Sequence, residues 1–346
     1  MKILITGGAG FVGSSLAKFF KQSYADSEVI AFDNLKRRGS ELNLPELKTL
    51  GVRFVHGDIR LASDFLQLDG DFDLIVDASA EPSVHAGTVD APDHVVGANL
   101  TGTFNCLNFA RNRTNAFLFL STSRVYSLAP LRNLPLTVTA TRFEMQPAEG
   151  ISEDFPTSTA RTLYGATKLA SEMLLQEFAA LYGLNAVIYR CGVIAGPGQF
   201  GKPDQGVFTL WLVRHYLRQA LQYTGFGGEG KQVRDLLHPL DLADLIAAHL
   251  PLFGVHRGEV FNVGGGRPIS VSLLELTDIC RSLTGNEVAV GSDPATSAVD
   301  IPIFITDTRR IRQAVQWAPR RNTETILQDT LRWIRNNETQ LRRLFF

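Results

Sequence analysis

The run Lys2-Ile3-Leu4-Ile5-Thr6-Gly7-Gly8-Ala9-Gly10-Phe11-Val12-Gly13 decides the fold that we predict for this chain. Its apolar first part is typical of a buried strand, and residues 14–20 have the pattern of an amphipathic helix. The glycines between them permit a tight turn and let a pyrophosphate approach the helix N-terminus. We therefore expect a dinucleotide to bind at Gly7, Gly10, Phe11, Val12 and Gly13.

Acidic residues follow two further predicted strands. Asp33 comes after the strand 28–32, and a carboxylate there accepts hydrogen bonds from the adenosine ribose and repels a 2′-phosphate. This favours NAD over NADP, although the nearby basic loop 36–38 blurs the choice; a solvated loop is its more ordinary role. Asp58 follows the strand 52–55 and suits either the adenine amino group or a helix N-cap, and spacing does not separate these roles.

Strands and helices alternate from residue 1 to about 190, with further strands at 74–76, 117–120 and 186–189. This pattern predicts an α/β fold with a Rossmann-type, doubly wound parallel sheet. After residue 191 the pattern changes to glycine-rich loops and helices, with one more strand at 259–263 and no periodic sheet of its own. We expect domains at 1–190 and 191–346, the second a smaller lobe with some segments returning to the first.

Tyr164 and Lys168 lie four residues apart in the helical segment 161–182, so both side chains leave the same helix face. A lysine cation on the next turn favours the phenolate and lowers the tyrosine pKa, which suits proton abstraction from an alcohol. By spacing alone, such a pair is more often an ordinary surface pair. Thr122 and Ser123 end a strand where α/β sheets bind ligands, or else form a simple hydroxyl-capped turn.

The long segment 127–160 has no clear periodicity, which is typical of a lid, a binding loop or a disordered region. The 346 residues carry a net charge of -1, so no global field attracts nucleic acid or an anionic membrane. Cys106, Cys191 and Cys280 are too sparse for a disulfide framework, and no spacing suggests a metal site. With no signal peptide or long apolar run, we expect a cytoplasmic protein.

Together these residues resemble the extended short-chain dehydrogenase/reductase family of nucleotide-sugar-modifying enzymes, over nearly the whole chain. The signature comprises Thr6-Gly7-x-x-Gly10-x-x-Gly13, Asp33, Asp58-Ile59, Asn99, the Ser/Thr cluster before Val125-Tyr126, Tyr164-x-x-x-Lys168, Gly196-Pro197 and Gln232-x-Arg234-Asp235. The resemblance implies an NAD-binding domain that carries Tyr164 as the base, Lys168 as its partner, and Thr122 and Ser123 beside them.

The resemblance also implies ligand contacts for residues outside the glycine turn. Those expected at NAD are Asp33, Asn34, Asp58, Ile59, Ala78, Ala80, Asn99, Tyr164 and Lys168. Those expected at a nucleotide-sugar substrate are Ser83, Thr122, Gln205 and Arg234, with Arg234 gripping the diphosphate. Homodimers or homotetramers are expected by resemblance, the dimers through helices like those at 95–111 and 161–182.

The implied reaction is epimerisation through a transient keto sugar with no net use of cofactor, most like that of CDP-sugar 2-epimerases. Sugar 4,6-dehydratases carry an Asp-Glu pair directly after the threonine, and related decarboxylases carry a Glu at the second of those positions. Here Ser123 and Arg124 stand there, which disfavours both reactions. Val193 and Ser297 depart from the expected substrate-binding residues of 4- and 2-epimerases, and Asp77–Glu81 replaces the commoner His-x-Ala-Gly/Ala-Gln; the sugar nucleotide stays open.

Three other functions remain open at this stage. The same scaffold supports a nucleotide-sugar reductase or dehydrogenase with net NAD(P)(H) turnover, and it also supports a UDP-sugar 4-epimerase. A dinucleotide-binding regulator without catalytic activity is a third alternative, which the intact Tyr–Lys pair disfavours.

Overall fold

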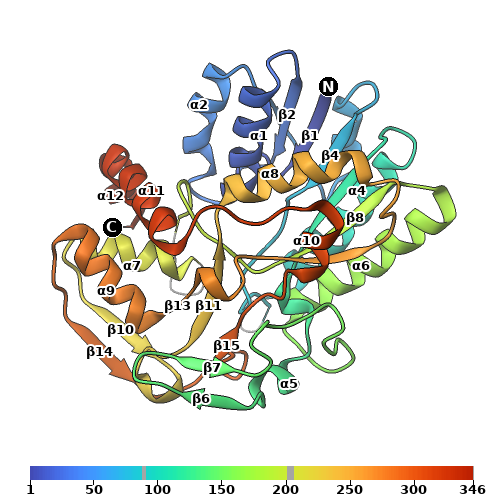
Figure 1. Ribbon diagram of the computed structural model, residues 1–346. Helices are drawn as coiled ribbons and strands as arrows, with labels where there is room; N and C mark the ends of the chain where they lie inside the picture. Colours follow the sequence, from blue (N-terminus) through green and yellow to red (C-terminus); the bar gives the residue numbers. More distant parts are fainter. Residues whose placement is uncertain (88–90, 201–205, 346) are drawn as a thin grey trace.

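The computed structural model describes residues 1–87, 91–200 and 206–345 (Figure 1). Within these residues, seven parallel strands form the central sheet in the order β12-β8-β5-β4-β1-β2-β3. The strands are β1 (Lys2–Thr6), β2 (Glu28–Asp33), β3 (Arg53–His56), β4 (Leu74–Asp77), β5 (Phe117–Thr122), β8 (Ala186–Cys191) and β12 (Val260–Val263). The order reverses between β1 and β4, and ligands bind at such a point in open α/β sheets. The predicted Rossmann-type fold is confirmed.

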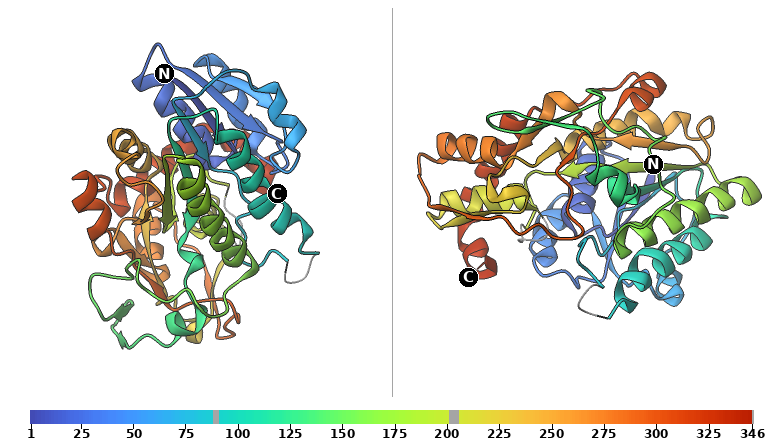
Figure 2. Two further views of the ribbon diagram at one scale, coloured as in Figure 1. Left: turned by 90° about the vertical axis from the view of Figure 1, so that its right-hand side faces the viewer. Right: turned by 90° about the horizontal axis from the view of Figure 1, so that it is seen from below.

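Helices cover both faces of this sheet (Figures 1 and 2). The helices α1 (Phe11–Ser23) and α8 (Pro239–His249) share one core with Ile3 and Ile5 of β1. The helices α4 (Gly102–Ala110) and α6 (Leu163–Tyr182) share the other core with Leu4. Alternate strand residues point to opposite faces, which explains why a continuous apolar run forms a strand buried on both sides.

The C-terminal half also forms two small sheets, so the expectation that it has none was wrong. One contains β9 (Val193–Ile194), β11 (Val233–Leu237), β13 (Ser270–Ser272) and β15 (Ile303–Phe304), and the other pairs β10 (Leu221–Thr224) with β14 (Val290–Asp293). These strands are two to five residues long, too short for alternation to stand out in the sequence. Except for β15, they pack with α7 (Val207–Tyr216), α9 (Leu273–Thr284) and α11 (Thr323–Asn336) around a third core.

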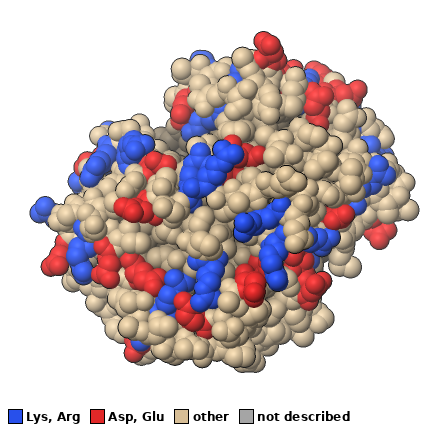
Figure 3. All heavy atoms as spheres, viewed as in Figure 1, with Lys and Arg blue, Asp and Glu red and all other residues tan. Residues whose placement is uncertain are grey.

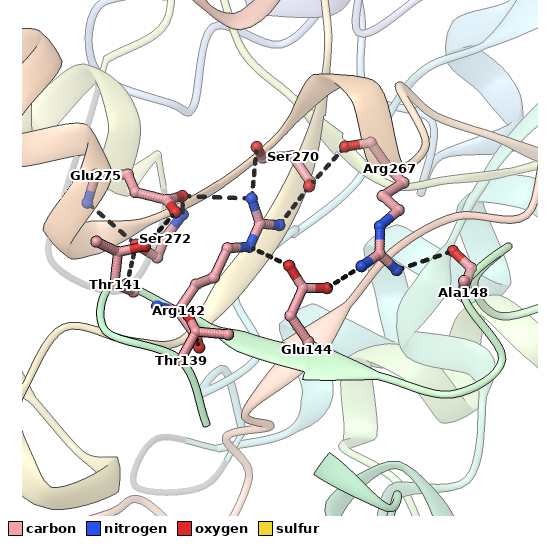
Figure 4. Close-up of polar contacts among 9 residues, drawn as sticks. All are labelled: Thr139, Thr141, Arg142, Glu144, Ala148, Arg267, Ser270, Ser272 and Glu275. Carbon is pink, nitrogen blue, oxygen red and sulfur yellow. Dashed lines mark hydrogen bonds and ion pairs between the residues drawn. The ribbon is translucent and has the colours of Figure 1, made fainter. Parts of the chain in front are cut away.

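The segment 127–160 is folded rather than irregular. It contains α5 (Leu128–Arg132) and a hairpin of β6 (Leu136–Val138) with β7 (Phe143–Met145). Arg142 forms ion pairs with Glu144 and Glu275, and Arg267 forms an ion pair with Glu144 (Figure 4). We call these three ion pairs the hairpin clasp. Arg142 Nε lies 3.1 Å from Glu144 Oε1, and its Nη1 lies 3.4 Å from Glu275 Oε2 at the start of α9. The clasp fastens the hairpin to the C-terminal half.

The remaining helices are α2 (Leu44–Thr49), α3 (Asp93–Val96), α10 (Arg309–Val315) and α12 (Glu338–Phe345), with a π-helical turn at Gly97–Thr101. None of the described helices is both long and apolar enough to cross a membrane. The described residues contain no cluster of three or more metal-ligating side chains. On the face seen in Figure 3, basic and acidic side chains are interspersed, as the near-zero net charge leads one to expect.

Candidate active site

The glycine turn between β1 and α1 has the geometry of a phosphate-binding turn. Gly7 has a φ of +64°, and a Cβ there would lie 2.9 Å from the carbonyl oxygen of Ala78. A Cβ at Gly13 would lie 2.1 Å from the Gly7 oxygen, whereas one at Gly10 would meet only that oxygen, at 3.2 Å. Gly10 precedes α1 and offers no side-chain cap, so the first-turn N–H groups remain open to an anion. The turn therefore fits a pyrophosphate.

A pocket of about 480 Å³ begins at this turn and crosses the strand ends. Most of the residues predicted for the cofactor line it, together with Ser83, which we predicted for the substrate: Gly7, Gly10, Phe11, Val12, Gly13, Asp33, Asn34, Asp58, Ile59, Ala78, Ala80 and Ser83. Sequence reasoning missed Arg60, Gln199 and Phe200, which also line the pocket. Phe200 packs its ring against Gly39 and Trp333. Both partners are distant in the sequence, so no local pattern predicts these contacts.

The two carboxylates that we predict for the adenosine of the cofactor are held in different ways. Asp33 accepts hydrogen bonds from the backbone N–H groups of Ala9 (3.1 Å) and Leu35 (2.7 Å), and its burial raises its pKa. Asp58 accepts from Asn34 Nδ2 at 3.0 Å and from the Arg60 guanidinium, which holds the Asp58 pKa well below its usual range. The following helical turn begins at Ala62 with Leu61 as N-cap, so Asp58 does not cap it.

Asn99 braces the wall of this pocket. Its buried amide accepts from Glu81 N (2.8 Å) and donates to Glu81 O (3.1 Å) and to Thr167 Oγ1 (3.3 Å). These bonds tie the segment after β4 to α6. A direct contact of Asn99 with the cofactor stays a prediction.

The fold brings Tyr164 to the C-terminal end of β5. Thr162 caps α6 by accepting from Gly165 N at 3.1 Å, and a Cβ at Gly165 would lie 2.0 Å from the carbonyl oxygen of Arg124. Glycine therefore lets the first turn of α6 press against the turn that follows Thr122. The Tyr164 hydroxyl hydrogen-bonds Thr122, while Ser123 lies next in the chain and is half-buried.

Burial controls the electrostatics of Tyr164 and Lys168. It raises the pKa of Tyr164 to about 12, and the Thr122 hydrogen bond and the Arg124 charge only partly oppose it. Burial also lowers the pKa of Lys168 to about 8, against the pull of the Asp77 carboxylate. The Lys168 ammonium lies 3.9 Å from the centre of the Phe119 ring. The Tyr164 pKa is thus above its ordinary value, contrary to the lowering that helical spacing alone predicts, because desolvation disfavours the phenolate.

Arg234 extends from β11 toward the same region and is already held in place. Its Nη2 donates to Asp300 Oδ1 (3.1 Å) and Ile301 O (2.9 Å), and its Nη1 donates to Val233 O (2.8 Å). Burial lowers its pKa, and Asp300 opposes this. Gln205, predicted for the substrate, lies outside the described residues.

The family model described as "NAD dependent epimerase/dehydratase family" matches residues 3–264. The chain belongs to this family. The match spans the glycine turn, both pocket carboxylates, Thr122, Tyr164, Lys168 and Arg234. The predicted family and its NAD dependence are confirmed, and the chain is an enzyme of the epimerase/dehydratase class.

Individual members of the family similar to this chain include epimerases and dehydratases. CDP-paratose 2-epimerase of Salmonella typhi is 32% identical over 96% of this chain and 99% of its own length. A dTDP-glucose 4,6-dehydratase of Streptomyces niveus is 29% identical over 97% of this chain and 94% of its own. A solved dTDP-glucose 4,6-dehydratase from Streptomyces venezuelae superimposes with a TM-score of 0.80 at 26% identity, covering 99% of this chain and all of that one. Overall similarity therefore does not distinguish an epimerase from a dehydratase, and the choice between the two reactions depends on the residues of the site.

Proposed function

We propose that this protein is an NAD-dependent nucleotide-sugar epimerase that acts through a transient keto sugar, with C2 of a CDP-sugar as the inverted centre. The observation that carries this is the pair Ser123-Arg124, directly after Thr122 and beside Tyr164. Elimination of water needs an acid to protonate the departing hydroxyl, and neither of these side chains is an acid. The likeness to a CDP-paratose 2-epimerase supports the choice of carbon and nucleotide.

The residues of the chain divide the remaining work. NAD supplies a reversible hydride acceptor when bound. Tyr164 removes the proton from the sugar hydroxyl and later returns it, and Thr122 orients the reacting oxygen through its hydroxyl. The Lys168 ammonium provides positive charge one helical turn from Tyr164 and is expected to hold the nicotinamide ribose. Arg234 binds the diphosphate as a planar donor already anchored by Asp300.

The test is to incubate purified protein with CDP-, UDP-, GDP- and dTDP-sugars, and to read the products by NMR together with near-ultraviolet absorbance. A new epimer of a CDP-sugar, changed at C2 and formed without stoichiometric reduced nicotinamide, is the expected outcome. Stoichiometric reduced nicotinamide would instead identify a dehydrogenase. A deoxy-keto product would identify a dehydratase, and a C4 epimer of a UDP-sugar would identify the alternative epimerase.

A further inference from the structure

Two arginines from distant parts of the chain converge on the segment Val299–Ile301. Arg124 reaches it from the turn after β5, with its Nη1 3.5 Å from Val299 O. Arg234 reaches it from β11, with its Nη2 3.1 Å from Asp300 Oδ1 and 2.9 Å from Ile301 O. The two guanidinium groups therefore stand near one another, anchored by the same short segment.

The charge of Arg124 is less well compensated than the charge of Arg234. Burial lowers the pKa of Arg124 to about 10, and repulsion by Arg234 contributes. Asp300 is the carboxylate that attracts both arginines. Arg234 is also attracted by Asp235, whereas among the described residues Arg124 is attracted by no carboxylate other than the shared Asp300. This half-buried cation therefore favours an anionic ligand whose oxygens match a planar donor.

Arg124 also lies beside the catalytic base. Its backbone N–H donates to Thr122 Oγ1 at 3.2 Å, and its carbonyl oxygen packs against Gly165, the residue after Tyr164. The Arg124 charge acts directly on the Tyr164 phenol. An anion bound by Arg124 would thus lie close to the sugar carbon that reacts.

The chemistry of a sugar nucleotide limits which carbon this can be. The diphosphate is attached at C1, so C2 is the neighbouring ring carbon, whereas C4 lies on the opposite side of the ring. With C4 at Tyr164, the phosphates would point away from the base. With C2 at Tyr164, the sugar-linked phosphate would lie near the base, on the side from which Arg124 approaches.

We infer that Arg124 binds the sugar-linked phosphate of a nucleoside diphosphate sugar and thereby holds C2, rather than C4, at Tyr164. This inference rests on the proposed sugar-nucleotide substrate. It assigns Arg124 a role in substrate specificity that is separate from the grip of Arg234.

The test compares CDP with CMP, because only CDP carries the second phosphate. Isothermal titration of the full chain with NAD present gives both affinities for wild type and for Arg124→Met, which removes the charge and keeps the length. We expect Arg124→Met to weaken CDP binding about tenfold or more and to change CMP binding by less than about twofold. Arg124→Lys should recover part of the loss.

Arg132→Met is the matched control. Arg132 donates to the residue just before this segment, with its Nη1 3.0 Å from Ala298 O, but it is exposed on α5. The Arg132→Met variant should therefore lose a contact with a carbonyl oxygen without changing the affinity for CDP or for CMP. If Arg124→Met weakens CDP and CMP binding equally, or weakens neither, or if Arg132→Met reproduces the selective loss, Arg124 is not the phosphate ligand.

Different results would contradict the role of Arg124 and the proposed reaction. If wild type inverts C4 of its sugar, the selection of C2 by Arg124 is overturned although the protein remains an epimerase. If wild type inverts no sugar nucleotide while Arg124→Met still loses CDP affinity selectively, the proposed reaction falls and the phosphate site stands.

Discussion

At the residue scale, desolvation shifts the pKa values of both Tyr164 and Lys168. Burial raises the pKa of the phenol to about 12 and lowers that of the ammonium to about 8. Both shifts disfavour the charged forms that proton transfer needs. Thr122 and Arg124 act in the opposite direction on Tyr164. The proposed acid/base function of this tyrosine therefore depends on neighbours that helical spacing does not show.

Tyr164→Phe should reduce turnover by at least about a thousandfold, because no other group would take the hydroxyl proton. NAD affinity should change little, since the pocket from Gly7 to Glu81 is lined by other residues. Steady-state rates and titration of NAD measure the two effects. Turnover within about tenfold of wild type would remove Tyr164 as the base.

Outside the candidate active site, three titratable side chains are linked by hydrogen bonds. The Tyr189 hydroxyl lies 2.8 Å from His249 Nδ1, and His249 Nε2 lies 2.6 Å from His256 Nδ1. His249 is fully enclosed, and burial lowers its pKa from 6.5 to about 4. His249 is therefore neutral in the folded protein at pH 7, and unfolding takes up a proton between these two pKa values.

The free energy of unfolding should consequently be at its full value above pH 6.5 and fall as the pH drops toward 4. His238, with a pKa also lowered to about 4 by burial, contributes with the same sign. A loss on the order of 3 kcal/mol per histidine is expected once the pH lies below both pKa values. Urea unfolding at several pH values measures how steeply the free energy of unfolding depends on pH. This dependence should be shallower for His249→Phe than for wild type. An unchanged dependence would contradict the role of His249 as a titrating group.

At the element scale, the hairpin of β6 and β7 depends on the clasp more than on its own strands. An isolated two-stranded hairpin is at best marginally stable in water. Here Arg142 joins Glu144 of the hairpin to Glu275 of α9, and Ser272 Oγ donates to Thr141 O at 2.8 Å (Figure 4). The segment is therefore ordered by contacts with residues more than a hundred positions away.

Arg142→Ala should lower the free energy of unfolding by about 1–3 kcal/mol, because Glu144 and Glu275 lose a partly buried partner. It should also make residues 134–148 the first site of limited proteolysis. Arg332→Ala is the control, since Arg332 forms an exposed pair with Asp329. That variant should stay within about 0.5 kcal/mol of wild type. Equal stability and equal cleavage of the two variants would show that the clasp does not hold the hairpin.

At the scale of the whole molecule, α4 and α6 lie side by side on one face of the sheet (Figures 1 and 2). Both helices leave large apolar side chains exposed. Met173 is 62% exposed and Leu181 is 71% exposed on α6, and Phe104 of α4 and Tyr182 are also exposed. Several large apolar groups on two neighbouring helices are typical of an interaction surface. This surface supports the expectation of a homodimer or homotetramer.

Light scattering coupled to gel filtration should give wild type a mass at least twice the 38.0 kDa of one chain. Met173→Glu should shift the mass toward the monomer, because a carboxylate would be buried without a partner. Val255→Glu is the matched control, since Val255 is at least as exposed as Met173 but lies in the connection between α8 and β12. A monomeric wild type, or an unchanged mass for Met173→Glu, would count against this surface.

The sequence by itself determined the fold and the cofactor end of the site. The glycine turn, Asp33 and the alternation of long apolar strands with helices are local patterns, because each depends on backbone sterics and on burial along one segment. Together with the family resemblance, these patterns identified close to half of the residues that line the pocket. They did not reveal the short strands of the C-terminal half, whose pairing partners are distant in the sequence.

Only the tertiary structure decided how the groups around Tyr164 act on one another. Tyr164, Arg124 and Arg234 come from three separate elements, and their charges interact only after the fold has brought them together and removed water. The hairpin clasp and the contacts of Phe200 are of the same kind. Desolvation and long-range pairing depend on three-dimensional packing, so local spacing predicts which residues are present but not the direction of their pKa shifts.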